Sequence, residues 1–112
     1  YTLWHTLSLH DALPIYVSAF NLIAKMDRFG DIAIAMGENI VGLSKRDAAD
    51  RALESIRKLS ADVGIPSGLE ELGVKEEDLP TMAENAQKDA CGLTNPRCPT
   101  LEDVIQIYKN AL

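Results

Sequence analysis

Apolar residues recur at helical spacing along most of this 112-residue chain, and this periodicity constrains its fold more than any other feature. Between residues 24 and 36, for example, four residues are spaced to share one helix face: Phe29, Ile32, Ala33 and Met36. The chain has no run of alternating β-branched residues and no Asn-Gly or Asp-Gly hairpin turn. The sequence therefore predicts an all-α fold, a helical bundle.

Capping residues, glycine and proline mark where the helices begin and end. Ser44 with Asp47, and Thr100 with Asp103, have the spacing of a capping box, with Asp at the position where Glu is more usual. Glycine and proline then predict helix ends and loops. The expected helices cover residues 16–21, 24–36, 44–63, 79–90 and 100–112, with a short helical turn at 67–72 and a loop at 91–99.

The charge of the chain argues against nucleic acid or an anionic membrane as a partner. It carries 17 acidic and 11 basic residues, a net charge of −6, and has no basic patch. The longest apolar run, residues 12–17, falls far short of the roughly 20 residues that span a bilayer. Two cysteines without a CxxC pair, and no recognisable secretory signal, fit a reducing compartment, so we expect a cytoplasmic protein.

Residues 1–15 differ in composition from the rest and contain the single tryptophan and both histidines. His5, His10 and Asp11 are candidate metal ligands or an acid–base pair, but with no further histidine they do not define a closed site. Residues 6–15, TLSLHDALPI, resemble the translation of a common sequencing adaptor. We therefore expect residues 1–15 to be a non-native leader and residues 16–112 to be the native sequence.

Residues 16–112 lack the combinations of side chains that common catalytic sites require. They contain no histidine, so a Ser-His or Cys-His nucleophile pair cannot form within them. Neighbouring carboxylates such as Glu70 and Glu71 diverge on a helix and are best interpreted as a solvated face. There is also no GxGxxG or GxxxxGK[ST] nucleotide motif. We predict no catalytic, cofactor-binding or metal-binding residue in this segment.

Two features of the expected loop at 91–99 leave alternatives open. Cys91 follows a helix end and opens a segment rich in glycine and proline, where a side chain can face a cleft. Its spacing alone favours core packing, because free cysteine is among the most often buried residues. The run Asn95-Pro96-Arg97 fits either a polar turn or a loop that faces a partner.

The segment from residue 64 to the end reads GIPSGLEELGVKEEDLPTMAENAQKDACGLTNPRCPTLEDVIQIYKNAL. It resembles the C-terminal end of the iron-dependent (group III) alcohol dehydrogenases, and the resemblance extends back to about Tyr16. Its most specific elements are Gly64-Ile65-Pro66, Leu72-Gly73-Val74, Lys88-Asp89-Ala90-Cys91 and Asn95-Pro96-Arg97. Residues 16–112 are thus identified as part of the C-terminal helical domain of such an enzyme.

The resemblance implies a two-domain enzyme that interconverts primary alcohols and aldehydes and assembles as a homo-oligomer. Its N-terminal α/β domain would hold NAD, and its helical domain Fe²⁺ or another divalent metal that acts as a Lewis acid on the alcohol oxygen. The Asp and three His that hold this metal lie upstream of the matching segment, so the metal role does not pass to His5 or His10. The resemblance assigns Cys91 to the lining of the substrate pocket.

The same resemblance implies that the fragment alone lacks the catalytic site and binds neither cofactor. We expect it to be inactive, marginally stable and prone to associate, because stripes such as Leu79, Met82 and Ala86 would have lost part of their cover. The alternative hypothesis is a free-standing acidic helical module that binds a protein partner.

Overall fold

The computed structural model describes residues 12–112, and within this range every regular element is helical. None of these helices combines the length and the hydropathy that a bilayer crossing requires. The all-α prediction is confirmed. The α-helices are α2 (Pro14–Asn21), α3 (Met26–Ala35), α4 (Lys45–Asp62), α5 (Leu79–Gln87) and α6 (Leu101–Ala111), and the 3-10 turns are η1 (Leu22–Ala24), η2 (Glu70–Leu72), η3 (Glu76–Asp78) and η4 (Ala90–Thr94).

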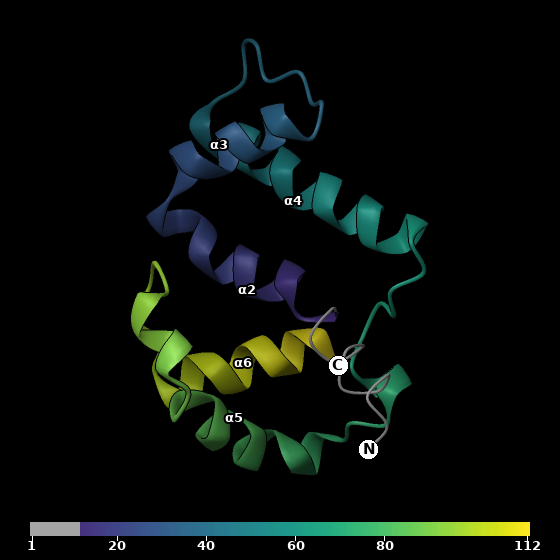
Figure 1. Ribbon diagram of the computed structural model, residues 1–112, viewed down its shortest axis with the longest axis vertical. Helices are drawn as coiled ribbons and strands as arrows, with labels where there is room; N and C mark the ends of the chain where they lie inside the picture. The colour runs from purple at the N-terminus through teal and green to yellow at the C-terminus, as the bar shows by residue number, and fades with distance from the viewer. Residues whose placement is uncertain (1–11) are drawn as a thin grey trace.

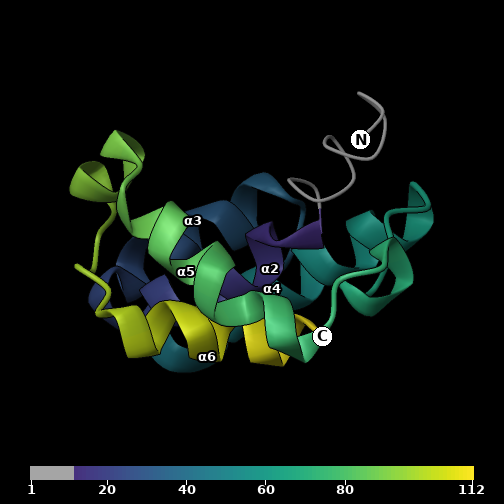
Figure 2. The same ribbon diagram turned by 90° about the horizontal axis from the view of Figure 1, so that it is seen from below.

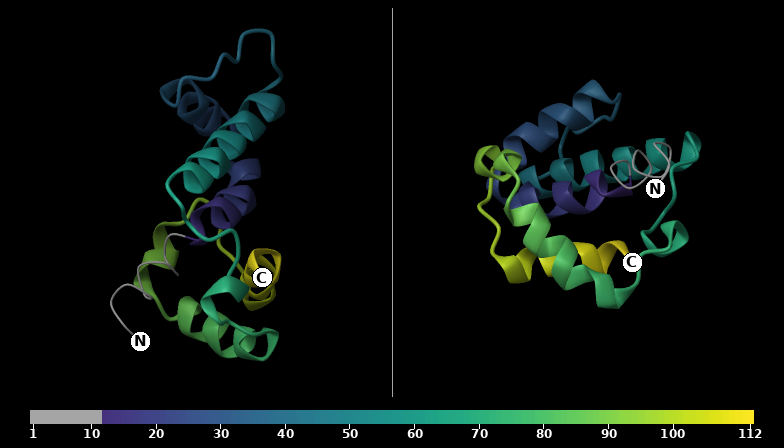
Figure 3. Two further views of the ribbon diagram at one scale, coloured as in Figure 1. Left: turned by 90° about the vertical axis from the view of Figure 1, so that its right-hand side faces the viewer. Right: turned by 60° about the horizontal axis from the view of Figure 1, so that its bottom comes forward.

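Helix α2 lies between two helix pairs (Figure 1). Helices α3 and α4 pack against each other on one side, α5 and α6 pack against each other on the other, and α2 contacts both α4 and α6. The same arrangement, with α2 between the α3–α4 pair and the α5–α6 pair, is visible in two further views (Figure 3). The radius of gyration is 14.8 Å, whereas a compact domain of this length has about 13 Å. The fold is therefore more extended than a typical domain of this length.

Most of the buried apolar side chains form two small clusters, one near each end of α2. Beside the C-terminal end, the first contains Leu22, Phe29, Ala33, Ala49 and Ala52. At the N-terminal end, Ala12, Leu69 and Ala111 form the second, next to the last turn of α6. Figure 2 shows α5 and α6 nearest the viewer. The end of α6 lies close to the start of α2, since Ala111 and Ala12 share the second cluster. Helix α2 therefore connects the two cores.

Both predicted capping sites are confirmed. The Ser44 hydroxyl accepts the backbone N–H of Asp47 at 3.1 Å and donates to its carboxylate at 2.7 Å. At α6, the Thr100 hydroxyl accepts the N–H of Asp103 at 3.2 Å, and the Asp103 carboxylate accepts the N–H of Thr100 at 2.9 Å. The backbone bond from Thr100, followed by its hydroxyl, holds the pKa of Asp103 below its usual value. Local sequence thus determines where these helices begin.

Three expected boundaries were wrong. The helix expected over 24–36 begins at Met26, because Lys25 has a non-helical backbone (φ −142°, ψ 42°) that separates α3 from η1. The helix expected over 79–90 ends at Gln87, because the backbone of Asp89 is extended (φ −75°, ψ 128°). The side chain of Asp89 then caps η4, so the loop expected over 91–99 begins inside a 3-10 turn.

The expected loss of cover over the α5 stripe is wrong at Leu79, the first residue of the stripe. Leu79 has no exposed surface and Ala83 is equally buried, because α6 packs over this face of α5. Met82 and Ala86 are half-buried. The most exposed large apolar side chains are instead Val41 in the loop between α3 and α4, at 89%, and Leu93 in η4, at 88%. Further exposed apolar side chains lie on helices, such as Ile34 on α3 and Leu59 on α4.

Gly68 lies against the C-terminal end of α6, where no side chain fits. The neighbouring Leu69 N–H donates to the carbonyl of Ala111 at 2.6 Å. A Cβ atom on Gly68 would lie 2.9 Å from the Leu112 carbonyl oxygen and 3.1 Å from that of Ala111. The backbone of the linker after α4 therefore packs directly on the last turn of the chain.

Gly68→Ala is expected to lower the free energy of unfolding by about 1–3 kcal/mol, because the added methyl group forces two packed backbones apart. Urea unfolding followed by circular dichroism measures this change. Gly92→Ala is the matched control, since a Cβ there meets no atom within 4 Å. Equal unfolding midpoints for the two variants would contradict this account of Gly68.

Candidate functional site

The turn that carries Cys91 is held by short-range hydrogen bonds. Asp89 precedes η4, and its carboxylate accepts the backbone N–H of Cys91 at 2.8 Å. The Thr94 hydroxyl donates to the Cys91 carbonyl at 3.0 Å, closing the turn from its other end. An aspartate before a turn commonly makes this side-chain cap, which leaves the following side chain free to point outward.

The side chain of Cys91 is exposed, so the interpretation of Cys91 as a core residue was wrong. The Asp89 carboxylate raises the pKa of the Cys91 thiol, first by accepting a hydrogen bond from it and then by its negative charge. The backbone N–H of Cys91, followed by its thiol, holds the pKa of Asp89 below its usual value. At neutral pH the thiol is therefore protonated, and it is a weak nucleophile despite its exposure.

A reciprocal amide pair attaches the next part of the loop to α2. The Asn95 side-chain amide donates to Asn21 Oδ1, and the Asn21 amide donates to Asn95 Oδ1, each at 2.8 Å. Asn95 also donates to the carbonyl of Arg97, which folds the loop back on itself. Asn21 is only 8% exposed, and both polar atoms of its side-chain amide are hydrogen-bonded to Asn95. The pair thus satisfies a buried amide that water does not reach.

Arg97 makes a second attachment at the neighbouring residue of α2. Its Nη1 donates to the carbonyl of Phe20 at 2.6 Å, and its Cζ lies 3.9 Å from the centre of the Phe20 ring. A cation is favoured at the negative end of a helix, and a cation–π contact adds about 0.5–1 kcal/mol at a partly exposed site. We call the contacts of Asn95 and Arg97 with Phe20 and Asn21 the clamp. The Asn95-Pro96-Arg97 run thus serves as a polar turn fastened within the chain.

Sequence reasoning did not single out Asn21 or Phe20. Among residues 12–112, Asn21 is the only polar residue that is buried. Its one sequence signal is an amide at the end of an apolar helix, a position where glycine or a basic residue is the usual choice. Its partner, Asn95, lies 74 positions away in the sequence, so no local sequence pattern predicts this pair.

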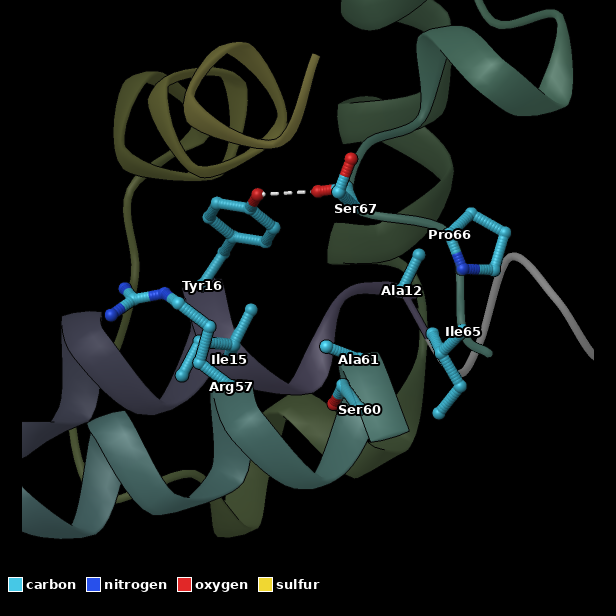
Figure 4. Close-up of a pocket in the computed structure, with 9 residues that line it drawn as sticks. All are labelled: Ala12, Ile15, Tyr16, Arg57, Ser60, Ala61, Ile65, Pro66 and Ser67. Carbon is cyan, nitrogen blue, oxygen red and sulfur yellow. Dashed lines mark hydrogen bonds between the residues drawn. The ribbon is translucent and has the colours of Figure 1, made fainter. Parts of the chain in front are cut away.

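A hollow of about 170 Å³ lies at the other end of α2 from the clamp (Figure 4). Apolar atoms of Ile15, Ala61 and Pro66 line it, and the Tyr16 hydroxyl donates to the Ser67 carbonyl at 2.8 Å along one wall. Arg57, at its edge, already pairs with Glu54 at 2.7 Å. The described residues that line the hollow thus present no carboxylate, imidazole or thiol that could act as a catalytic group.

The part of the chain that the structure describes contains no group of three or more His, Cys, Asp or Glu side chains that could hold a metal ion. These residues by themselves therefore do not fit a metal centre. His5, His10 and Asp11, the candidate ligands of the sequence analysis, lie outside the described residues.

Asp89→Asn is expected to lower the pKa of the Cys91 thiol and to speed its alkylation severalfold at mildly alkaline pH. The asparagine oxygen still caps η4, but the carboxylate charge that disfavours the thiolate is gone. The rate of iodoacetamide labelling, measured as a function of pH in a Cys98→Ser background, reports on the Cys91 thiol alone. Glu84→Gln on α5 controls for the lost charge. An unchanged rate would show that Asp89 does not suppress the thiolate.

Proteins of known activity are similar to this chain. The family described as "Fe-containing alcohol dehydrogenase family, C-terminal" matches residues 1–112. The NAD-dependent methanol dehydrogenase of Bacillus methanolicus is 48% identical over 112 residues, which are 100% of this chain and 29% of that protein. The 1,3-propanediol dehydrogenase of Klebsiella pneumoniae is 46% identical over 111 residues, 99% of this chain and 28% of that protein.

Solved structures have the same fold. A 1,3-propanediol oxidoreductase superposes with a TM-score of 0.91 at 46% identity, covering 94% of this chain and 28% of that one. An alcohol dehydrogenase from Oenococcus oeni superposes with a TM-score of 0.88 at 45% identity, covering 91% and 27%. The chain thus spans less than a third of the length of these relatives. It belongs to the Fe-containing alcohol dehydrogenase family, a family of enzymes, and corresponds to the C-terminal helical part of its members.

Proposed function

We propose that this chain is the C-terminal segment of a cytoplasmic, NAD-dependent, iron-containing alcohol dehydrogenase that interconverts small primary alcohols and aldehydes by hydride transfer. The observation that carries the proposal is the superposition on 1,3-propanediol oxidoreductase at a TM-score of 0.91 with 46% identity. Relatives named for methanol, 1,3-propanediol and lactaldehyde support a small substrate. The full-length enzyme would be a homo-oligomer.

In this proposal the segment supplies a wall of the active site and none of its reacting groups. Cys91 lines the substrate side, and its protonated thiol and the exposed Leu93 present a weakly polar surface to a short alcohol. The metal, either iron or another divalent ion, and NAD would be held by the part of the enzyme upstream of this segment.

We further propose that residues 1–15 are a non-native leader. The supporting feature is the adaptor-like string at residues 6–15. The family match includes residues 1–15, Ala12 is buried in the second core cluster, and α2 begins at Pro14. The last residues of the leader would therefore also serve as the start of helix α2.

The isolated 112-residue chain is expected to form no NADH from NAD and methanol or 1,3-propanediol, because it lacks the residues that would hold the metal and the dinucleotide. A chimera is expected to be active. In it, residues 16–112 replace the matching C-terminal segment of the Bacillus methanolicus methanol dehydrogenase, to which the whole chain is 48% identical. Absorbance at the NADH band measures both activities.

Two controls make this experiment decisive. The intact methanol dehydrogenase sets the reference rate, and the same enzyme truncated before the replaced segment sets the background. A chimera that is folded, retains iron and binds NAD but oxidises no alcohol would contradict the proposed function. NADH formation by the isolated chain would contradict the assignment of the reacting groups to the upstream part.

The genomic DNA upstream of the Tyr16 codon distinguishes the enzyme from a free-standing helical module. An in-frame continuation that encodes an Asp and a His-rich metal segment in place of the adaptor-like string is the expected result. Long-read sequencing of the source locus provides this measurement. A start codon with a ribosome-binding site near Tyr16 would instead support the protein-binding module.

A further inference from the structure

The η4 turn packs beside α5, and the clamp joins the residues that directly follow it to α2. The hydrogen bonds that Asp89 and Thr94 make with Cys91 lie within the turn itself. From α5, Gln87 donates to the Pro99 carbonyl at a long 3.4 Å. Figure 1 shows η4 at the edge of the molecule, beside the C-terminal end of α2. The place of η4 relative to α2 therefore depends on Asn95 and Arg97.

The clamp is suited to fix a position as well as to add stability. The two amides exchange a pair of hydrogen bonds, each 2.8 Å long, so the Asn95 side chain has a single orientation that satisfies both. Arg97 engages the Phe20 ring and the Phe20 carbonyl together, which fixes the plane of its guanidinium. These contacts hold consecutive residues of a helix whose two ends adjoin the two core clusters.

We propose that the clamp is a positioning device that fixes the Cys91 turn against helix α2. Asn95 and Arg97 are thus positioning residues for the substrate side of the active site. This role rests on the proposed function, in which Cys91 lines that side. Loss of the clamp leaves η4 folded by its internal hydrogen bonds but free to shift as a unit, since its cap at Asp89 is independent of Asn95.

The test measures the place of η4 directly, in the full 112-residue chain and without substrate. Nitroxide labels at Cys91 and at the exposed Ala19→Cys of α2, in a Cys98→Ser background, give a distance distribution by pulsed electron paramagnetic resonance. The unaltered clamp should give one narrow distribution. The double variant Asn95→Ala with Arg97→Met should give a distance distribution that is about twofold broader or is shifted to another mean distance. Loop positions that exchange on the μs–ms timescale are trapped together when the sample is frozen, so they appear as a wider range of distances.

Matched variants separate positioning from stability. Gln87→Ala removes the loop contact to α5 and leaves the clamp intact, so its distribution should stay narrow. Arg97→Lys keeps the charge but loses the planar stacking on Phe20, and Asn95→Asp keeps one bond to Asn21, so each should broaden the distribution partly. If the double variant unfolds, as judged by circular dichroism, these two single variants decide the question.

Folded clamp variants with an unchanged narrow distribution would overturn the proposal, as would equal broadening by Gln87→Ala. Because no alcohol, metal or NAD takes part in this measurement, its result is independent of the activity of the chimera. A broadened distribution together with an inactive chimera would retain the clamp as a positioning device and reject the substrate role of the turn that it holds.

Discussion

The rest of the structure depends on helix α2, which contacts a helix pair on each side and reaches a core cluster near each end. Leu22 directly follows it in the first cluster, and Ala12 precedes it in the second. The buried side chains are mostly alanines, with Leu22, Leu69 and Leu79 as the largest that are fully buried. Each cluster alone buries little apolar surface, so the fold relies on one short helix to join them.

The placement of polar groups follows from this arrangement. At its C-terminal end, α2 leaves backbone carbonyls without partners inside the helix, and Arg97 satisfies one of them while covering the Phe20 ring. Asn21, the next residue, is buried and pairs with Asn95. Farther back along α2, the Tyr16 hydroxyl donates to the Ser67 carbonyl of the linker after α4. The helix thus organises segments that are distant in sequence.

Under the proposed function, the described residues would supply a wall of the substrate pocket. Cys91 is exposed yet held in its thiol form by Asp89, which suits a surface that contacts a small alcohol without reacting with it. The relatives that the chain matches are more than three times its length. Reacting groups and a wall that positions the substrate can come from different parts of one polypeptide.

Local rules in the sequence were sufficient for the fold class, the caps at Ser44 and Thr100, and the helix ends near Gly37 and Gly64, because each depends on residues within a few positions of one another. The exposure of Cys91, the burial of Leu79 and the clamp depended on tertiary structure. The burial of Leu79 and the clamp each require segments far apart in the chain to meet, and Asn21 meets Asn95 across 74 positions. Periodicity identifies the apolar face of each helix, but the partner that covers the face is decided only when the helices pack.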